Sequence, residues 1–141
     1  MTEKSGQCLC GAVKFTAVPK TNEVGVCHCA MCRRNNAGPF FAIDCGDTLV
    51  FEDETNVGVY DSSEWAQRGF CKQCGSSLFW RLKDKSMGAV AVDAFDDLDG
   101  LEMTHEVFID EKPGYYSFAE KTQQLTGQQV FDMVAADQGE H

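Results

Sequence analysis

The sequence lacks the features of membrane and exported proteins. No run approaches the roughly 20 consecutive apolar residues that a bilayer-spanning helix needs. The amino end, Met1 to Ser5, has no apolar segment of the kind found in signal peptides. Internal repeats, low-complexity tracts and a glycine-rich phosphate loop are also absent from the sequence. These absences predict a cytoplasmic protein that does not bind a membrane.

Positive charge is scarce. Lys and Arg number 12 against 22 Asp and Glu, which gives a formal net charge of −10. Between residue 93 and the carboxyl end, Lys112 and Lys121 are the only basic residues. An acidic chain repels phosphate backbones and anionic lipids, so we expect no nucleic-acid partner. Any group that binds a substrate anion should lie before residue 93.

The sequence has neither a Ser-His-Asp order nor paired carboxylates, so hydrolase mechanisms have no support. A length of 141 residues leaves room for one domain. Hydrophobic residues at 43% and charged residues at 24% are near the globular average, which excludes disorder, collagen and coiled coil.

Cysteine is abundant, with eight in the chain. Seven of them form short motifs, and Cys45 stands alone. The motifs are Cys8-x-Cys10, Cys27-x-Cys29-x-x-Cys32 and Cys71-x-x-Cys74. In a reducing compartment, thiols at such spacings are more often metal ligands than disulfides.

The spacing predicts two metal sites. Two pairs, Cys8/Cys10 and Cys71/Cys74, together supply the four thiolates of a tetrahedral structural zinc. Cys27, Cys29 and Cys32 are then left as three ligands, and a zinc with three protein ligands keeps a fourth position for water or substrate. Two alternatives stay open: Cys45 or another residue closes the second site and both zincs are structural, or the thiolates share metals in a binuclear cluster.

Short apolar runs with strand periodicity predict an all-β domain of short antiparallel strands. Residues 12–18 alternate between apolar and polar side chains, and six further runs are separated by turn residues. They begin at Phe40, Thr48, Val57, Ser77, Ala89 and Glu106. We expect a turn with a short helix over 27–36 and an amphipathic helix over 126–137.

The cysteine motifs also resemble those of a known family. The strings Gly6-x-Cys8-x-Cys10-Gly11, Cys27-His28-Cys29-x-x-Cys32-Arg33 and Arg68-x-Phe70-Cys71-x-x-Cys74-Gly75 are similar to the glutathione-dependent formaldehyde-activating family, which includes the centromere-protein-V domain. The resemblance implies a β-tent fold, a zinc-binding domain over residues 5–120 and an acidic extension over 121–141. It also implies two Zn²⁺ per chain: a structural one on Cys8, Cys10, Cys71 and Cys74, and a catalytic one on Cys27, Cys29 and Cys32.

The activity that the resemblance implies is carbon–sulfur bond formation or cleavage with glutathione and formaldehyde, or a related small aldehyde. A zinc with three thiolates favours a fourth soft ligand, so a substrate thiol could bind as thiolate and attack the carbonyl. Alternatively, zinc polarises the carbonyl oxygen while free thiolate attacks. The rival hypothesis, suggested by the centromere branch, is a zinc-stabilised binding module without activity.

Two residues next to Cys27, Cys29 and Cys32 have predicted roles in the second site. Arg33 follows Cys32 and is predicted to hold a substrate carboxylate, with ordinary solvated surface as the alternative. His28 lies between two ligands, so its ring should point away from the metal, and we expect it to support the site rather than to bind the metal.

Overall fold

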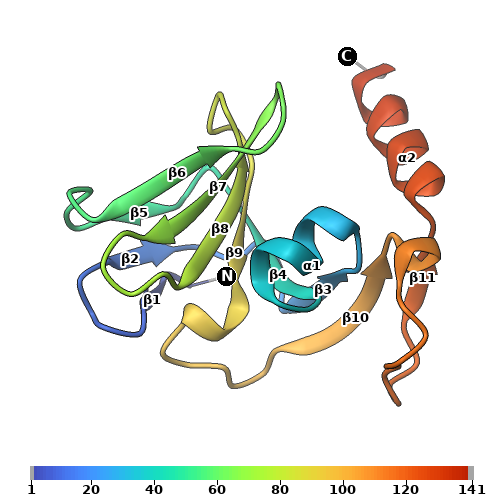
Figure 1. Cartoon of the computed structure of the whole chain (residues 1–141), viewed down its shortest axis with the longest axis horizontal. Helices are drawn as coiled ribbons and strands as arrows, with labels where there is room; N and C mark the ends of the chain where they lie inside the picture. Colours follow the sequence, from blue (N-terminus) through green and yellow to red (C-terminus); the bar gives the residue numbers. More distant parts are fainter. Residues whose placement is uncertain (1, 140–141) are drawn as a thin grey trace. The chain divides into compact units, whose positions relative to one another are not determined.

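The computed structural model describes residues 2–139, and among them eleven strands make the chain mostly β (Figure 1). It divides into two compact units. The first contains residues up to Asn22 together with Ala42–Leu101, and the second contains Glu23–Phe41 with the residues from Glu102 on. The all-β prediction is therefore confirmed. None of the helices within residues 2–139 is long and apolar enough to span a membrane.

The first unit contains two antiparallel groups of strands. One has the order β1-β2-β5, and in the other β4, which belongs to this unit from Ala42 on, is followed by β9, β8, β7 and β6 as successive neighbours. The strand bounds are β1 (Lys4–Gln7), β2 (Lys14–Ala17), β4 (Phe40–Gly46), β5 (Val50–Phe51), β6 (Val57–Asp61), β7 (Ala66–Cys71), β8 (Ser77–Leu82) and β9 (Gly88–Ala91). A short 3₁₀ helix, η1 (Val92–Ala94), follows β9.

The core of the first unit surrounds Phe15. Strand β2 alternates as the sequence predicts, with Phe15 and Ala17 buried and Lys14 exposed. The Phe15 ring meets Phe95 edge to face at 5.5 Å, and Phe51 contacts Phe79 at 5.6 Å between ring centroids. These rings fix β2 against the other strands and so hold the turn that precedes it.

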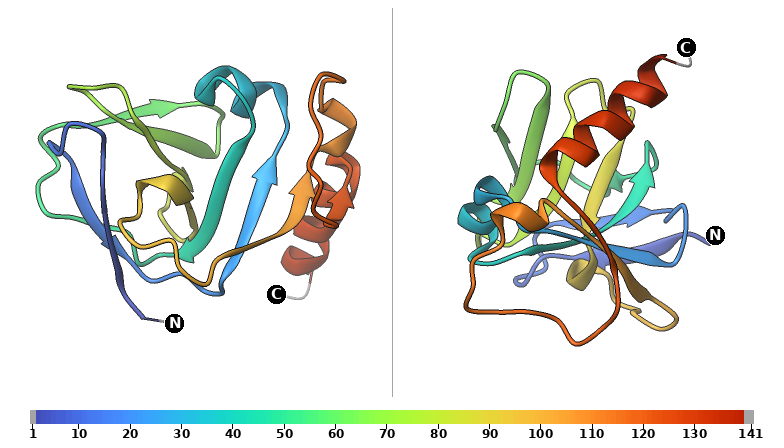
Figure 2. Two further views of the ribbon diagram at one scale, coloured as in Figure 1. Left: turned by 90° about the horizontal axis from the view of Figure 1, so that it is seen from below. Right: turned by 90° about the vertical axis from the view of Figure 1, so that its right-hand side faces the viewer.

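The second unit is built on β3 (Glu23–Cys27), β10 (Glu102–Val107) and β11 (Gln123–Leu125). Strand β10 pairs with both β3 and β11, and both pairings are parallel. The left view of Figure 2 shows β3 and β10 running side by side in one direction. The expectation of purely antiparallel strands is therefore wrong here. Parallel pairing is possible because long connections join these strands.

The helices of the second unit follow the prediction. Helix α1 (Ala30–Asn36) lies within the expected segment 27–36, and α2 (Gly127–Gly139) covers most of 126–137. A 3₁₀ helix, η2 (Ile109–Glu111), follows β10 where the sequence predicts more strand. Residues 140 and 141 of the predicted extension lie outside the described residues. Strand β11 lies within the predicted extension 121–141 and pairs with β10.

Candidate metal centres

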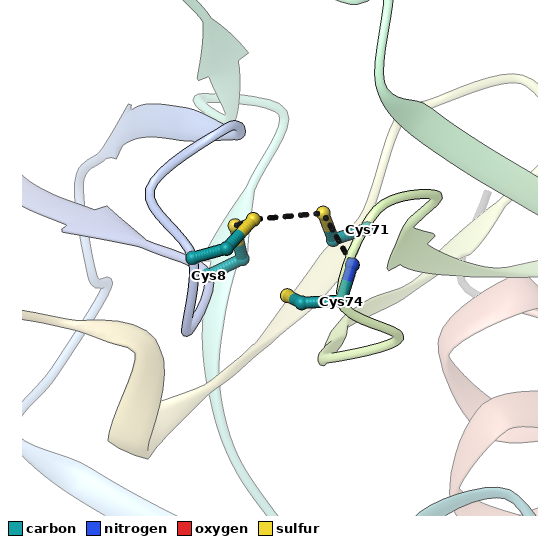
Figure 3. Close-up of side chains that lie close together, drawn as sticks. Cys8, Cys71 and Cys74 are labelled. Carbon is teal, nitrogen blue, oxygen red and sulfur yellow. Dashed lines mark hydrogen bonds between the residues drawn. The ribbon is translucent and has the colours of Figure 1, made fainter.

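The first cysteine group joins two turns of the first unit (Figure 3). Cys8 and Cys10 lie in the turn after β1, Cys71 ends β7, and Cys74 lies in the turn before β8. Their four sulfur atoms lie within 4.8 Å of one another. The structure thus brings together all four cysteines that the spacing assigns to one site.

Both turns have the same construction. Each ends in a glycine with a positive φ, +81° at Gly11 and +80° at Gly75. The glycine N–H donates back to the carbonyl of the first cysteine, Gly11 to Cys8 at 3.2 Å and Gly75 to Cys71 at 2.8 Å. An L side chain rarely adopts this conformation, so glycine is what allows each turn to aim two sulfurs in one direction.

The sulfur separations fit a metal rather than a disulfide. Cys8 Sγ lies 3.7 Å from Cys10 Sγ, and Cys10 Sγ lies 3.8 Å from Cys71 Sγ. Four sulfurs about 2.3 Å from a tetrahedral zinc are about 3.8 Å apart, whereas a disulfide needs about 2.05 Å. All eight cysteines are free thiols in the structure.

Hydrogen bonds prepare this group for metal binding. The Ser76 hydroxyl and backbone lower the pKa of Cys74 to about 5, and Ser76 Oγ lies 3.2 Å from Cys74 Sγ. The Val13 N–H donates to Cys8 Sγ at 3.3 Å, and the Gln73 N–H donates to Cys71 Sγ at 3.3 Å. Donors aimed at sulfur favour the thiolate, which is the form that binds metal.

The second group lies where β3 meets α1 in the second unit. Cys27 ends β3, Cys29 is the N-cap of α1, and Cys32 lies in its first turn. The three sulfurs lie within 4.8 Å of one another. The Cys29 side chain accepts a hydrogen bond from the Cys32 N–H at 3.3 Å, so the cap itself places one ligand.

Ionisation of one of these three thiols is opposed by the other two. Cys29 and Cys32 raise the pKa of Cys27 far above its ordinary value. A cation at the centre reverses this effect, because it favours the thiolates that otherwise repel one another. The group is therefore a candidate metal centre with three protein ligands.

Cys45 belongs to neither group. It is buried in the core cluster of the first unit, and burial raises its pKa to about 12. Among the described residues, no fourth His, Cys, Asp or Glu side chain joins the three cysteines. The structure favours a core role for Cys45 over the alternative in which it closes the second site.

His28 is completely buried, and both ring nitrogens have hydrogen-bond partners other than metal ligands. Nδ1 lies 2.7 Å from the Tyr116 hydroxyl, and Nε2 lies 2.7 Å from Glu106 Oε1. The ring thus points away from the three sulfurs, as its place between two ligands predicts. Sequence reasoning missed Glu106 and Tyr116, although an acid inside a strand of the β3–β10 pair is a signal of a buried partner.

Arg33 lies on α1, half-buried, and its Nε donates to the His28 carbonyl at 2.9 Å. The guanidinium keeps its two terminal amino groups for another acceptor. Arg34 is exposed. His105 packs its ring against the Gly25 backbone of β3.

A mostly β chain that gathers seven cysteines into a group of four and a group of three is a candidate thiolate metalloprotein. The chain belongs to the glutathione-dependent formaldehyde-activating enzyme family, whose sequence model matches residues 3–111. The resemblance predicted from the cysteine motifs is thereby confirmed.

Two curated relatives carry names of the same kind. A Schizosaccharomyces pombe protein named as an uncharacterized lyase is 33% identical over 135 residues, which cover 95% of this chain and 98% of that protein. A Halomonas elongata protein named "Putative glutathione-dependent formaldehyde-activating enzyme" is 32% identical over 83 residues, covering 52% of this chain and 53% of that one. A solved structure of a Rhodobacter sphaeroides protein has the same fold, with a TM-score of 0.56 and 23% identity over 70% of this chain and 90% of that one. The family and the relatives together indicate an enzyme of the lyase kind.

Proposed function

We propose that this chain is a zinc-dependent carbon–sulfur lyase or synthase that acts on a thiol adduct, with glutathione and formaldehyde or a related small aldehyde as reactants. The observation that carries the proposal is the group of Cys27, Cys29 and Cys32, which has three sulfurs and no fourth metal-binding side chain among residues 2–139. Three protein ligands are typical of catalytic zinc, and four are typical of structural zinc. We assign Cys8, Cys10, Cys71 and Cys74 to the structural zinc.

The donor sets fit zinc. All seven side chains are thiols, which suit a soft tetrahedral cation, and the two sulfur–sulfur distances given above for the group of four match a tetrahedral edge. When bound by the three cysteines, zinc would supply a position for a substrate thiolate or for the carbonyl oxygen of the aldehyde. We propose two zinc ions per chain, one for each group.

The reaction joins a thiol R–SH and an aldehyde. A carbon–sulfur bond forms, the S–H bond breaks, and the proton ends on the former carbonyl oxygen to give R–S–CH₂–OH from formaldehyde. The reverse direction cleaves the same carbon–sulfur bond. No oxidant or reductant is required, so the chain's own task is to bind and orient the reactants.

Arg33 supplies the positive charge for orientation. Its Nε is held by the His28 carbonyl, which fixes the guanidinium beside the three cysteines while its amino groups stay available. A planar guanidinium binds a carboxylate with two parallel hydrogen bonds. We assign Arg33 to a carboxylate of the thiol substrate, of which glutathione has two.

The family membership and the lyase name of the S. pombe relative support this proposal. Both sites need reduced thiols, which is consistent with a cytoplasmic location of the protein. A purely structural or binding role would require the second zinc to be saturated by protein ligands.

The test compares Cys29→Ser with Cys45→Ala. Serine keeps the N-cap of α1 but is a poor ligand for a soft metal. Cys45 is a core residue that belongs to neither group of sulfurs. Exchange of isotope-labelled formaldehyde with S-hydroxymethylglutathione is followed by NMR against the spontaneous rate. We expect the wild type and Cys45→Ala to accelerate exchange and Cys29→Ser to lose the acceleration. A folded, two-zinc wild type that leaves exchange at the spontaneous rate would favour the binding module.

A further inference from the structure

The loop that carries the three clustered cysteines is bound by one short segment of the same unit. The His28 N–H donates to the Val107 carbonyl at 3.1 Å, and the Ala30 N–H donates to Glu111 Oε1 at 3.0 Å. His28 and Ala30 adjoin Cys29 on either side. One segment therefore holds the backbone on both sides of a clustered sulfur.

A left-handed residue turns the chain between these two contacts. Glu111 lies four positions after Val107, but their partners are two positions apart, so an extended chain would carry Glu111 away from Ala30. Phe108 has a φ of +55°, which side chains other than glycine rarely adopt, and η2 begins directly after it. In the right view of Figure 2 this turn, in orange, lies beside the blue helix α1. Such a conformation persists only where the surrounding structure fixes it.

The start of α2 fixes this turn. The Gly127 N–H donates to Asp110 Oδ1 at 2.9 Å. Gly127 is buried, and a Cβ added there would lie 2.7 Å from the Phe108 ring, so glycine is what allows the ring to pack. The same ring meets Phe131 of α2 edge to face at 5.8 Å between centroids. These contacts hold the segment that carries Glu111.

The bond from Ala30 to Glu111 completes the hydrogen bonding of the turn between two cysteines. Ala30 is the first residue of α1, so its N–H has no acceptor within the helix, and the Glu111 oxygen supplies one. The Cys32 N–H donates to Cys29 Sγ at 3.3 Å. With both donors paired, the backbone between the two sulfurs is held in one arrangement.

We propose that Glu111 is a positioning residue of the three-cysteine metal centre: its carboxylate, carried on η2 and braced by the start of α2, fixes the loop so that the sulfurs are placed before a metal binds. This inference rests on the proposed function. Glu111 acts through the backbone and is not one of the clustered ligands. The inference gives α2 a task at this centre, although α2 lies beyond residue 111, where the match to the family model ends.

The test measures zinc affinity in the whole protein by competition with a chromophoric chelator. Glu111→Ala removes the acceptor, whereas the amide oxygen of Glu111→Gln can accept the same N–H. Glu120→Ala is the matched control, because it removes an exposed glutamate of the same unit. Cys32→Ser shows which zinc belongs to the four-cysteine group, and that zinc is the internal reference.

We expect Glu111→Ala to weaken zinc at the three-cysteine group about three- to tenfold, the effect of losing a hydrogen bond at the start of a helix, and to leave the other zinc unchanged. Glu111→Gln should restore the affinity to within about twofold of the wild type, because the acceptor is kept. Glu120→Ala should match the wild type at both groups.

Three results would overturn the inference with the proposed function intact. The first is wild-type affinity of Glu111→Ala at the three-cysteine group. The second is equal weakening at both groups, which would show general destabilisation. The third is the same weakening in Glu111→Gln or Glu120→Ala, which would show an effect of charge. A wild type that binds zinc only at the four-cysteine group would remove the proposed function, and this inference with it.

Gly127→Ala examines the brace. The added Cβ displaces the Phe108 ring, so we expect weaker zinc at the three-cysteine group, whereas Gly114→Ala should have no effect because nothing lies within 4 Å of its Cβ. Combining Gly127→Ala with Glu111→Ala should weaken zinc no more than Glu111→Ala alone, since both act through one contact. Unchanged affinity in Gly127→Ala, or losses that add, would overturn the role of α2.

Discussion

Cys10 Sγ and Cys71 Sγ lie 3.8 Å apart although 61 positions separate them in the chain. This separation ties the turn after β1 to the turn between β7 and β8 within the first unit. Because the strands of these turns have only four to six residues, a metal that joins them contributes to folding as well as to local order.

Removal of the metals is predicted to unfold the protein. Structural zinc in thiolate sites contributes about 10 kcal/mol or more, which is comparable with the whole stability of a small domain. Circular dichroism melting before and after chelation should show loss of the cooperative transition, and added zinc should restore it. An unchanged Tm in protein shown by metal analysis to be zinc-free would contradict this prediction.

Gly75→Ala is predicted to destabilise the first unit by about 1–2 kcal/mol, because alanine must adopt φ +80° there. Gly114→Ala is the matched control, since its φ is ordinary and nothing lies within 4 Å of an added Cβ. Urea denaturation of both variants measures the difference in the free energy of unfolding. Equal stability of the two variants would show that the turn tolerates a side chain.

Cys32→Ser is predicted to bind one zinc per chain and Cys45→Ala to bind two. Cys32 is one of the three clustered sulfurs, whereas Cys45 packs in a hydrophobic core. Metal analysis of the purified variants by mass spectrometry gives the count. Loss of a zinc in Cys45→Ala would reinstate Cys45 as a ligand.

Glu106 is predicted to contribute to the decrease in the free energy of unfolding at acid pH. Its pKa is lowered in the folded protein, so it stabilises the fold above the ordinary value of 4.5, and this contribution is lost as the pH falls through the folded pKa. Urea denaturation between about pH 6 and pH 3 should show a shallower decline for Glu106→Gln than for the wild type. The thiolates are the same in both proteins, so the difference in slope belongs to Glu106. Parallel slopes would contradict the assigned pKa shift.

Much of the fold could be predicted from local patterns. The alternation around Phe15 predicts β2, and the apolar runs at Phe40, Ser77 and Ala89 coincide with β4, β8 and β9. Strand β7 escaped detection because its sequence, AQRGFC, has no clear apolar alternation. The parallel pairing of β10 with β3 depends on contacts about 80 positions apart, which a local pattern does not contain.

The cysteine motifs predict both candidate metal centres because ligand spacing is itself local. The contacts that hold the residue between Cys27 and Cys29 in place are not local. Glu106 and His28 are separated by 78 positions, and Tyr116 and His28 by 88, so neither contact leaves a trace in the sequence near the cysteines. A buried acid is recognisable only once the strand that carries it is paired.

We propose that a zinc held by Cys27, Cys29 and Cys32 keeps one position for substrate. A crystal structure of the zinc-loaded protein, with anomalous scattering recorded at the zinc edge, would show the ligands of both metals. We expect two zinc ions, one bound by Cys8, Cys10, Cys71 and Cys74, and the other bound by three cysteines and a ligand from solvent that glutathione sulfur replaces. A fourth protein side chain on the second zinc, or no zinc at those three cysteines, would contradict it.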